Sequence, residues 1–298
     1  MLAFGIHSEQ RSGRYSATTK VDLATWVDWG KSIFVWSKNN KQENMSTTNK
    51  TALITGGSRG LGRNMAVGIA RKGIDVVITY HADKAAADEV VADIRALGQH
   101  ASAFQLDTRN IQQFDDFAKR LTGHLRKQNG DPKVDFLINN AVTALYALAG
   151  DTTEEQVEAM FDIHYKGVFF LTQKMLPYLS DGGSIINVSS GLTRITNPGS
   201  SVYASMKGAV EVYTRYLAKE LGGRKIRANV VAPGAIETDF GGGRVRDNKD
   251  INTRIADVTA LGRVGAPEDI GGVVAFLCTA EAYWINGQRI EVSGGQAL

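Results

Sequence analysis

The chain has 298 residues, of which 43% are hydrophobic and 22% are charged, a composition typical of a soluble globular protein. Its formal net charge of +3 is too small to indicate a nucleic-acid partner, and no apolar run approaches the roughly 20 residues of a membrane-spanning helix. The single cysteine, Cys278, excludes an internal disulfide framework and favours a reducing compartment, so we expect a cytoplasmic protein. Because Cys278 follows an apolar run, we expect a buried thiol rather than a nucleophile.

The first 47 residues differ from the rest of the chain. They carry three of the four tryptophans (Trp26, Trp29 and Trp36) and show no alternation of strand and helix patterns. They lack the apolar core of a signal peptide and contain acidic residues, which are rare in transit peptides. We expect residues 1–47 to be a loosely ordered extension. The alternative is that its aromatic residues dock on a partner.

From residue 48 onward, short apolar runs alternate with segments of helical periodicity. Residues 74–80 (IDVVITY) illustrate the runs, which are continuous and rich in β-branched residues, as in strands buried on both faces. Strands are expected at 51–54, 74–80, 101–106, 134–139, 184–189, 225–231 and 288–292. Helices are expected at 61–72, 83–97, 111–126, 153–179, 202–221 and 267–279, the fourth being capped by Asp151 or Thr152.

Repeated strand–helix units predict an α/β fold with one doubly wound parallel sheet, Rossmann-like, and helices on both faces. No linker interrupts residues 48–298, so we expect one domain there that binds a dinucleotide and carries the catalytic residues. The last strand is expected at an edge of the sheet. Ligands of such sheets lie beyond the carboxyl ends of the strands, which directs attention to the polar residues there.

The stretch Thr55–Gly62, TGGSRGLG, joins the first strand to the first helix. Glycines without a Cβ let the backbone turn tightly and approach a pyrophosphate, and the free amides of the helix N-terminus favour its negative charge. The spacing is G-x-x-x-G-x-G rather than the more common G-x-G-x-x-G. An ordinary glycine-rich turn remains the alternative.

Tyr203 and Lys207 stand four positions apart in YASMK, a spacing that places both side chains on one face of a helix. The pair alone is a weak signal, because Tyr80 and Lys84 show the same spacing. Only Tyr203 opens a predicted helix thirteen positions after a serine at a strand end, Ser190.

With these pieces in view, the chain resembles the short-chain dehydrogenase/reductase family from Lys50 to its end, in particular the NADP-preferring members that are similar to 3-oxoacyl-carrier-protein reductases. The order and spacing of the matching motifs are more specific than any one of them. They are TGGSRGLG, the LINNA run ending at Ala141, VSS ending at Ser190, YASMK and the PGAIET run from Pro233 to Thr238.

The resemblance implies a hydride transfer between a nicotinamide cofactor and a carbonyl or alcohol, with Tyr203 as proton donor or acceptor. It implies that Ser190 positions the substrate oxygen, and that Lys207 holds the nicotinamide ribose and lowers the tyrosine pKa. The required pKa shift has a reasonable size. Lowering the pKa of a phenol from about 10 to about 7 takes about three units, or roughly 4 kcal/mol. One ammonium at about 4 Å supplies roughly that much at an effective dielectric constant near 20.

Two positions depart from the family pattern. His164 stands where the family usually has an asparagine that is thought to hold a water in the proton relay. We hypothesise that His164 takes over this role, since histidine donates, accepts and titrates near neutrality. The alternative is that it only packs and bonds a helix carbonyl. Val142 replaces a glycine that often follows Asn-Asn-Ala, which would narrow the space near the cofactor.

The cofactor expected is NADP(H). An acidic residue at the end of the second strand would indicate NAD, but Tyr80 and His81 stand there. Arg59 in the glycine turn can bind a 2′-phosphate with its guanidinium, helped by His81 and Lys84, unless it is only a solvated loop residue.

The resemblance further places Asp107 and Thr108 at the adenine, Asn140 along the ribose, and Ile236 and Thr238 at the carboxamide. The alternative is that Asp107 caps the next helix. The residues expected at the cofactor are Gly56, Ser58, Arg59, Gly60, Leu61, Gly62, Tyr80, His81, Asp107, Thr108, Asn140, Tyr203, Lys207, Pro233, Gly234, Ile236 and Thr238. No metal site is expected.

Residues 239–265, which contain FGGGRVRDN directly after Asp239, are expected to form a mobile lid over the substrate. Their arginines could bind an anionic group, although interleaved aspartates favour a mixed solvated face. The partners expected are a small carbonyl or alcohol substrate, with no nucleic acid and no membrane, and by resemblance three further copies of the chain in a homotetramer. The rival function is a non-catalytic NADP(H)-binding or sensing protein on the same fold.

Overall fold

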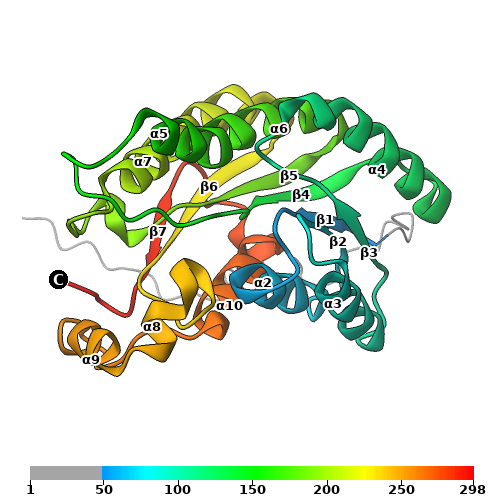
Figure 1. Cartoon of the computed structure of the whole chain (residues 1–298). Helices are drawn as coiled ribbons and strands as arrows, with labels where there is room; N and C mark the ends of the chain where they lie inside the picture. Colours follow the sequence, from blue (N-terminus) through cyan, green and yellow to red (C-terminus); the bar gives the residue numbers. More distant parts are fainter. Residues whose placement is uncertain (1–48) are drawn as a thin grey trace, which may run out of the picture. The chain divides into compact units, whose positions relative to one another are not determined.

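Seven parallel strands form one sheet in the order β3-β2-β1-β4-β5-β6-β7 (Figure 1). The structure is a computed structural model and describes residues 49–298, so the expectations for residues 1–47 lie outside the described residues. The strands are β1 Thr51–Ile54, β2 Asp75–Tyr80, β3 Ala101–Gln105, β4 Val134–Asn139, β5 Leu179–Val188, β6 Arg227–Pro233 and β7 Arg289–Val292. The predicted doubly wound parallel sheet with β7 at one edge is confirmed.

Helices cover both faces of the sheet. In Figure 1, α4 (Phe114–Asn129), α5 (Glu154–Phe161), α6 (Gly167–Met175) and α7 (Ser201–Glu220) lie above it. Below it lie α2 (Gly60–Ala70), α3 (Lys84–Ala96) and α10 (Pro267–Leu277), with the short α8 (Arg244–Asp247) and α9 (Lys249–Asp257) beside them.

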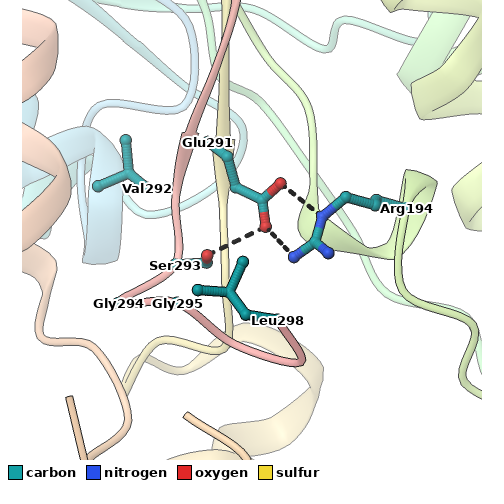
Figure 2. Close-up of a pocket in the computed structure, with 7 residues that line it drawn as sticks. All are labelled: Arg194, Glu291, Val292, Ser293, Gly294, Gly295 and Leu298. Carbon is teal, nitrogen blue, oxygen red and sulfur yellow. Dashed lines mark hydrogen bonds and ion pairs between the residues drawn. The ribbon is translucent and has the colours of Figure 1, made fainter. Parts of the chain in front are cut away.

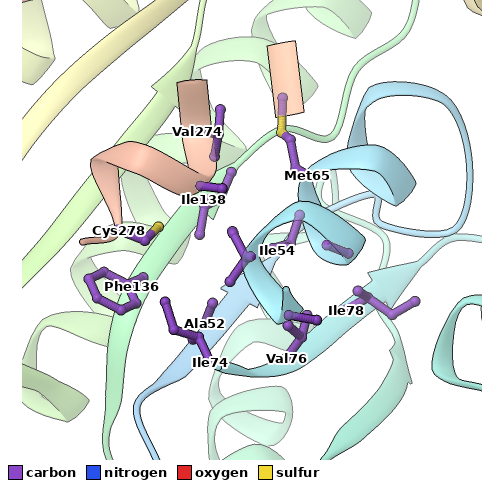
Figure 3. Close-up of a cluster of buried hydrophobic side chains, with 14 of the residues drawn as sticks. Ala52, Ile54, Met65, Ile74, Val76, Ile78, Phe136, Ile138, Val274 and Cys278 are labelled. Atoms are coloured by element: carbon purple, nitrogen blue, oxygen red, sulfur yellow. The ribbon is translucent and has the colours of Figure 1, made fainter. Parts of the chain in front are cut away.

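Each layer has its own apolar core. Strand side chains alternate between the two faces, so Ile54 and Ile78 pack with Met65 of α2 and Val274 of α10 (Figure 3). Leu53, the neighbour of Ile54, belongs to the other cluster, with Phe114, Phe117 and Leu121 of α4. Both sets of side chains are almost fully buried. Because burial of a large aliphatic side chain contributes about 2 kcal/mol, these two layers hold the strand ends in fixed positions.

The expected long helix at 153–179 is interrupted. Thr153, rather than Asp151 or Thr152, caps α5 in a capping box with Gln156. A π-helical turn, η3 (Asp162–Lys166), then separates α5 from α6. A 3-10 turn with Pro177 ends the helical stretch, because proline cannot continue a helix, and β5 begins at Leu179, five residues earlier than expected.

The expected lid contains regular structure. A 3-10 turn, η7 (Phe240–Gly243), leads into α8 and α9. Three consecutive glycines, Gly241, Gly242 and Gly243, have φ between +62° and +75°, a conformation that other residues rarely adopt. They turn the chain sharply between β6 and α8. No helix within residues 49–298 has the length and apolar character needed to cross a bilayer.

Candidate active site

The glycine turn is held by its neighbours in a form that leaves the start of α2 free. Asn140 donates its side-chain amide to the carbonyl oxygens of Thr55 (2.9 Å) and Gly56 (3.1 Å). A Cβ on Gly62 would overlap the Gly56 carbonyl oxygen, which is why the tight approach needs glycine there. Arg59 is the N-cap residue of α2, and its side chain caps no amide. The first helical amides are therefore available to a pyrophosphate.

Gly56 and Gly60 have φ of +65° and +52°, so both use the left-handed conformation that the turn requires. Ser58 and Leu61 lie in the same turn and are half-buried. The glycine spacing thus encodes a left-handed turn that leads directly into the N-terminus of α2, and the residues present fit a dinucleotide phosphate.

The end of β2 carries no acid. Tyr80 is 9% exposed and closes the strand, and His81 follows with an exposed side chain. Arg59 is also exposed. Two basic side chains and a missing carboxylate fit a cofactor with a 2′-phosphate better than one with a free ribose hydroxyl.

Asp107 does not cap the next helix, because Asn110 does so by accepting the amide of Gln112. Its carboxylate instead pairs with Arg109, at 2.8 Å to Nη2, which lowers the pKa of Asp107. His81 Nε2 lies 3.5 Å from the same carboxylate. Arg109 therefore joins the basic edge near β2 and β3, a residue that motif reasoning missed although it stands only two positions beyond Asp107.

The remaining residues expected at the cofactor lie on loops that follow β3, β4 and β6. Thr108 is buried, and the start of α6 packs against its carbonyl at Gly167. Pro233 ends β6, Gly234 donates to the Val292 carbonyl (3.0 Å), and Ile236 pairs with Gly265 in an isolated bridge. Thr238 is 8% exposed and lies close to Gly60, so the loop after β6 reaches the glycine turn.

Tyr203 and Lys207 lie one turn apart on α7, and both are buried, with 7% and 2% of their surface exposed. The Lys207 ammonium lies 5.8 Å from the centre of the Tyr203 ring and donates to the Val188 carbonyl at 2.8 Å. Ser190 follows β5 in extended backbone, and its hydroxyl accepts the amide of Leu192 at 3.2 Å. The structure thus brings all three residues to the carboxyl end of β5.

Burial controls the protonation of this group. It raises the pKa of Tyr203 above its ordinary value, while the Ser190 hydroxyl beside the phenol acts in the opposite direction. Burial also lowers the pKa of Lys207 to about 7. Tyr203 is therefore a neutral phenol at pH 7 in this state, the form that can donate a proton. The cationic help expected from Lys207 requires its ammonium form, which burial disfavours.

His164 lies at the centre of the π-helical turn and is fully buried. Its ring meets the Tyr203 ring edge to face, with centroids 5.0 Å apart. Nε2 lies 3.0 Å from the carbonyl oxygen of Thr143, so Nε2 carries the hydrogen, and Nδ1 is left as a buried acceptor without a protein partner among the described residues. The carbonyl belongs to the loop after β4 rather than to a helix.

The titration assumed for His164 does not occur near neutrality. Burial, followed by the charge of Lys207, lowers the pKa of His164 to about 2. The imidazole is therefore neutral at physiological pH, and any part that it takes in proton transfer uses hydrogen bonding rather than its own ionisation.

Two aromatic residues missed by motif reasoning complete the surroundings of the phenol. Phe240 of η7 packs on the Tyr203 ring with centroids 5.8 Å apart. Tyr146, in the loop after β4, approaches Gly241, and the Arg244 guanidinium lies 4.8 Å from the centre of the Tyr146 ring. No local motif marks either residue, because both come from irregular loops that only the fold places together.

The structure also describes three further positions that the sequence analysis singled out. Tyr80 and Lys84 are not on one helix, since Tyr80 ends β2 and Lys84 begins α3. Val142 is 40% exposed in the loop after Asn140. Arg246 pairs with both Asp239 and Asp247, as a mixed charged face predicts.

Comparison with known proteins agrees with this geometry. A family model described as enoyl-(acyl carrier protein) reductase matches residues 56–297. A hydroxynaphthalene reductase-like protein of Metarhizium brunneum is 33% identical over 264 residues, which cover 84% of this chain and 96% of that protein.

Two solved structures share the fold. The promiscuous reductase LugOII, described as catalysing keto-reduction at C1 in lugdunomycin biosynthesis, is 39% identical with a TM-score of 0.80, over 85% of this chain and all of that one. The angucycline C-6 ketoreductase LanV with bound NADP is 34% identical with a TM-score of 0.79, over 83% of this chain and 95% of that one. The chain belongs to the short-chain dehydrogenase/reductase family.

Proposed function

We propose that the protein reduces a ketone to an alcohol with NADPH, and that Tyr203 donates the proton to the substrate oxygen. The observation that carries this proposal is the buried phenol of Tyr203, neutral at pH 7, with Ser190 and Lys207 beside it at the carboxyl end of β5. The protein is an NADP(H)-dependent carbonyl oxidoreductase of its family.

The glycine turn and its basic edge support the choice of NADP(H). The amides at the start of α2 would bind the pyrophosphate. Arg59 and His81 are exposed where the adenosine ribose of the cofactor would lie, and β2 ends without a carboxylate. Asp107 and Thr108 would lie beside the adenine of the cofactor. Asn140, Ile236 and Thr238 would lie beside its nicotinamide half. When bound, NADPH supplies the hydride.

Three side chains would have separate roles in the protonation of the substrate carbonyl oxygen. The Ser190 hydroxyl would hold the carbonyl oxygen, and the Tyr203 phenol would protonate it as negative charge develops. Lys207 would bind the ribose hydroxyls, whose oxygens favour the ammonium form, and so stabilise the phenolate that the proton transfer leaves. General acid catalysis of this kind typically contributes about 10²–10⁴-fold to the rate.

We further propose that His164 replaces the relay asparagine through its unpartnered Nδ1. This atom is a buried acceptor beside Tyr203 and Lys207, suited to a water that returns a proton to the phenolate. In His164→Ala, turnover should fall and the pH profile should change, and His164→Asn should restore part of the turnover. An unchanged turnover and pH profile in His164→Ala would leave only the packing role.

The substrate class that we propose is a fused aromatic ketone. LugOII, LanV and the hydroxynaphthalene reductase-like relative bear names that refer to reduction of such compounds or of keto groups. Phe240 packs on the Tyr203 ring and Tyr146 approaches the neighbouring Gly241, so both add aromatic surface near the phenol, and planar rings pack well against aromatic faces.

A homotetramer in the cytoplasm is the assembly and location that we propose. Large apolar side chains are exposed on α5 and α7, where Val157, Phe161, Val212 and Tyr216 are 38–63% exposed. Phe276 on α10 is 40% exposed. Exposed apolar helix faces of this kind are typical of subunit interfaces. Light scattering of the purified full chain measures the subunit number directly.

The decisive experiment is a spectrophotometric screen of NADPH oxidation with naphthol-derived and larger fused aromatic ketones, simple ketones and α,β-unsaturated acyl thioesters. We expect turnover of aromatic ketones at the carbonyl, with loss of turnover in Tyr203→Phe. Reduction of the carbon–carbon double bond alone would contradict carbonyl reduction. No turnover of any substrate, with NADPH binding retained, would favour the sensing protein.

A further inference from the structure

A cluster of charged side chains lies under the turn that carries Ser190. We call residues 189–194 the serine turn. The cluster consists of Arg194 at the end of that turn, Glu211 on α7, and Arg289 and Glu291 on β7. Their side chains are only 13–39% exposed, and the proposed reaction uses none of them.

Glu211 binds the serine turn from both ends. Its Oε1 accepts hydrogen bonds from the hydroxyl groups of Ser189, at 2.6 Å, and Thr193, at 2.8 Å. It also accepts the Nε hydrogen of Arg289 at 2.8 Å. One carboxylate thus joins the residues on either side of Ser190 to the edge strand.

Arg289 contacts the backbone of Ser190 itself. Its Nη2 lies 3.3 Å from the Ser190 carbonyl oxygen and 3.0 Å from the Thr193 hydroxyl, while Nη1 donates to Glu291 at 2.9 Å. The planar guanidinium fixes these directions together, which a lysine could not do.

The cluster continues to the end of the chain. Figure 2 shows the forked pair of Arg194 with Glu291, at 2.6 and 2.8 Å, and the bond from Ser293 to the same carboxylate, beside a pocket of about 590 Å³. Arg194 also donates to the carbonyl oxygens of Gln296, at 2.8 Å, and Ala297, at 3.3 Å. The serine turn is therefore tied to β7 and to the residues that follow it.

The position of Glu211 on α7 connects the cluster to the residues proposed to carry out the reaction. Tyr203, Lys207 and Glu211 are four residues apart, so they follow one face of a single helix. A single helix therefore carries the Tyr203 phenol and, about two helical turns further along, the Glu211 carboxylate that binds the serine turn. Movement of the turn relative to α7 would separate the Ser190 and Tyr203 hydroxyl groups.

We propose that Glu211 and Arg289 are positioning residues that hold the Ser190 hydroxyl at the Tyr203 phenol. This inference rests on the proposed function of Ser190 and Tyr203. Neither residue is expected to touch the substrate or the cofactor. A displacement of about 1 Å in a reacting geometry can lower a rate by about 10²-fold, so the expected loss lies between tenfold and that value.

The test uses Glu211→Ala, Glu211→Gln and Arg289→Ala in the full chain, with NADPH and the best ketone from the screen. We expect kcat to fall roughly 10–100-fold in the alanine variants while the Kd for NADPH is unchanged. Glu211→Gln keeps an acceptor oxygen and should recover part of kcat. The matched control is Arg224→Ala, which removes an arginine that binds Asp181 and two backbone carbonyls at the other end of β5.

A pH profile of alcohol oxidation separates positioning from general loss of stability. Ser190 lowers the pKa of Tyr203, so its displacement should move the Tyr203 limb upward by about half a pH unit or more. Arg224→Ala should leave the limb in place. If Glu211→Ala is poorly folded, Glu211→Gln must still show an upward shift, smaller because it keeps an acceptor oxygen, and absence of any shift would overturn the proposal.

Ser190→Ala distinguishes the two levels of inference. Should Ser190→Ala keep full turnover, the proposed function of Ser190 fails. Should it lose turnover while Glu211→Ala and Arg289→Ala keep theirs, only the positioning role fails. In the Ser190→Ala background, adding Glu211→Ala should cost little more, since both changes act through one hydroxyl. A full additional loss there would show that Glu211 acts elsewhere and overturn the proposal.

Discussion

The cofactor half and the catalytic half of the site differ in the solvent exposure of their ionisable side chains. Around the glycine turn and the ends of β2 and β3, Arg59, His81 and Arg109 keep their side chains at the surface. Around β5 and α7, Lys207 and His164 are buried, and burial shifts the pKa of each. A cofactor phosphate brings its own charge and can be met by solvated cations, whereas proton transfer needs groups whose ionisation the protein sets by desolvation.

The sharpest test of the catalytic half is Tyr203→Phe. We expect kcat to fall by about 10²–10⁴-fold, because the proton donor is lost, with little change in NADPH binding. Stopped-flow or steady-state NADPH oxidation measures the rate, and cofactor fluorescence measures the binding. Tyr213→Phe is the matched control, since Tyr213 lies on the same helix and is also partly buried. Equal losses in the two variants would remove the special role of Tyr203.

Lys207 tests whether burial sets the ionisation. The folded pKa of about 7 lies below the ordinary 10.5, so the unfolded chain binds more protons between these values, and stability should rise with pH across that window. Lys207→Met removes the buried amine. We expect it to stabilise the cofactor-free protein at pH 7 and below, by up to roughly 5 kcal/mol.

The measurement is denaturant unfolding from pH 6 to pH 10.5, with exposed Lys127→Met as control. The difference between Lys207→Met and the unchanged protein should shrink as pH rises. A difference independent of pH would show that Lys207 stays charged in the folded protein.

Arg59→Ala examines the cofactor half. Loss of a charge-assisted hydrogen bond to the 2′-phosphate should lower the preference for NADPH over NADH by roughly 10–100-fold in kcat/KM. Arg63→Ala is the control, because Arg63 lies one turn along α2 and pairs with Glu89 and Asp93 instead. Equal use of both cofactors by the unchanged protein would refute the NADP(H) preference.

Arg109→Ala should have the smallest effect of the four. Its guanidinium is already neutralised by Asp107, so we expect only a few-fold rise in KM for NADPH that diminishes at high salt. Kinetics at two ionic strengths measure it. A loss as large as that in Arg59→Ala would show that Arg109 binds the phosphate directly.

The regular part of the fold was predictable because the strands are short apolar runs and the helices have apolar residues that recur at helical spacing. β1 and β4 match their expected ranges, and most other boundaries shift by no more than two residues. Three elements were not predictable. The π-helical turn at His164 is stabilised by tertiary contacts rather than by local propensity, and α8 and α9 follow a glycine run that resembles a loop.

The site was predictable where one motif carries several of its members. Tyr203 and Lys207 share a helix, and the glycine turn is contiguous, so spacing alone brings those residues together. Tyr146, Phe240 and Arg289 are far apart in the chain and meet the site only through the fold. The pKa of His164 was wrongly expected to be near neutral, because sequence does not reveal that its ring is fully buried.

Residues 296 and 297 connect parts of the molecule that are far apart in the sequence. Ala297 donates to the Val258 carbonyl (2.8 Å), and the Gln296 side chain accepts the amide of Ala235 (3.0 Å), so the last residues fasten α9 and the loop after β6. Because Arg194 donates to the carbonyl oxygens of the same two residues, a change that moves either of them would loosen the serine turn and the loop after β6 together.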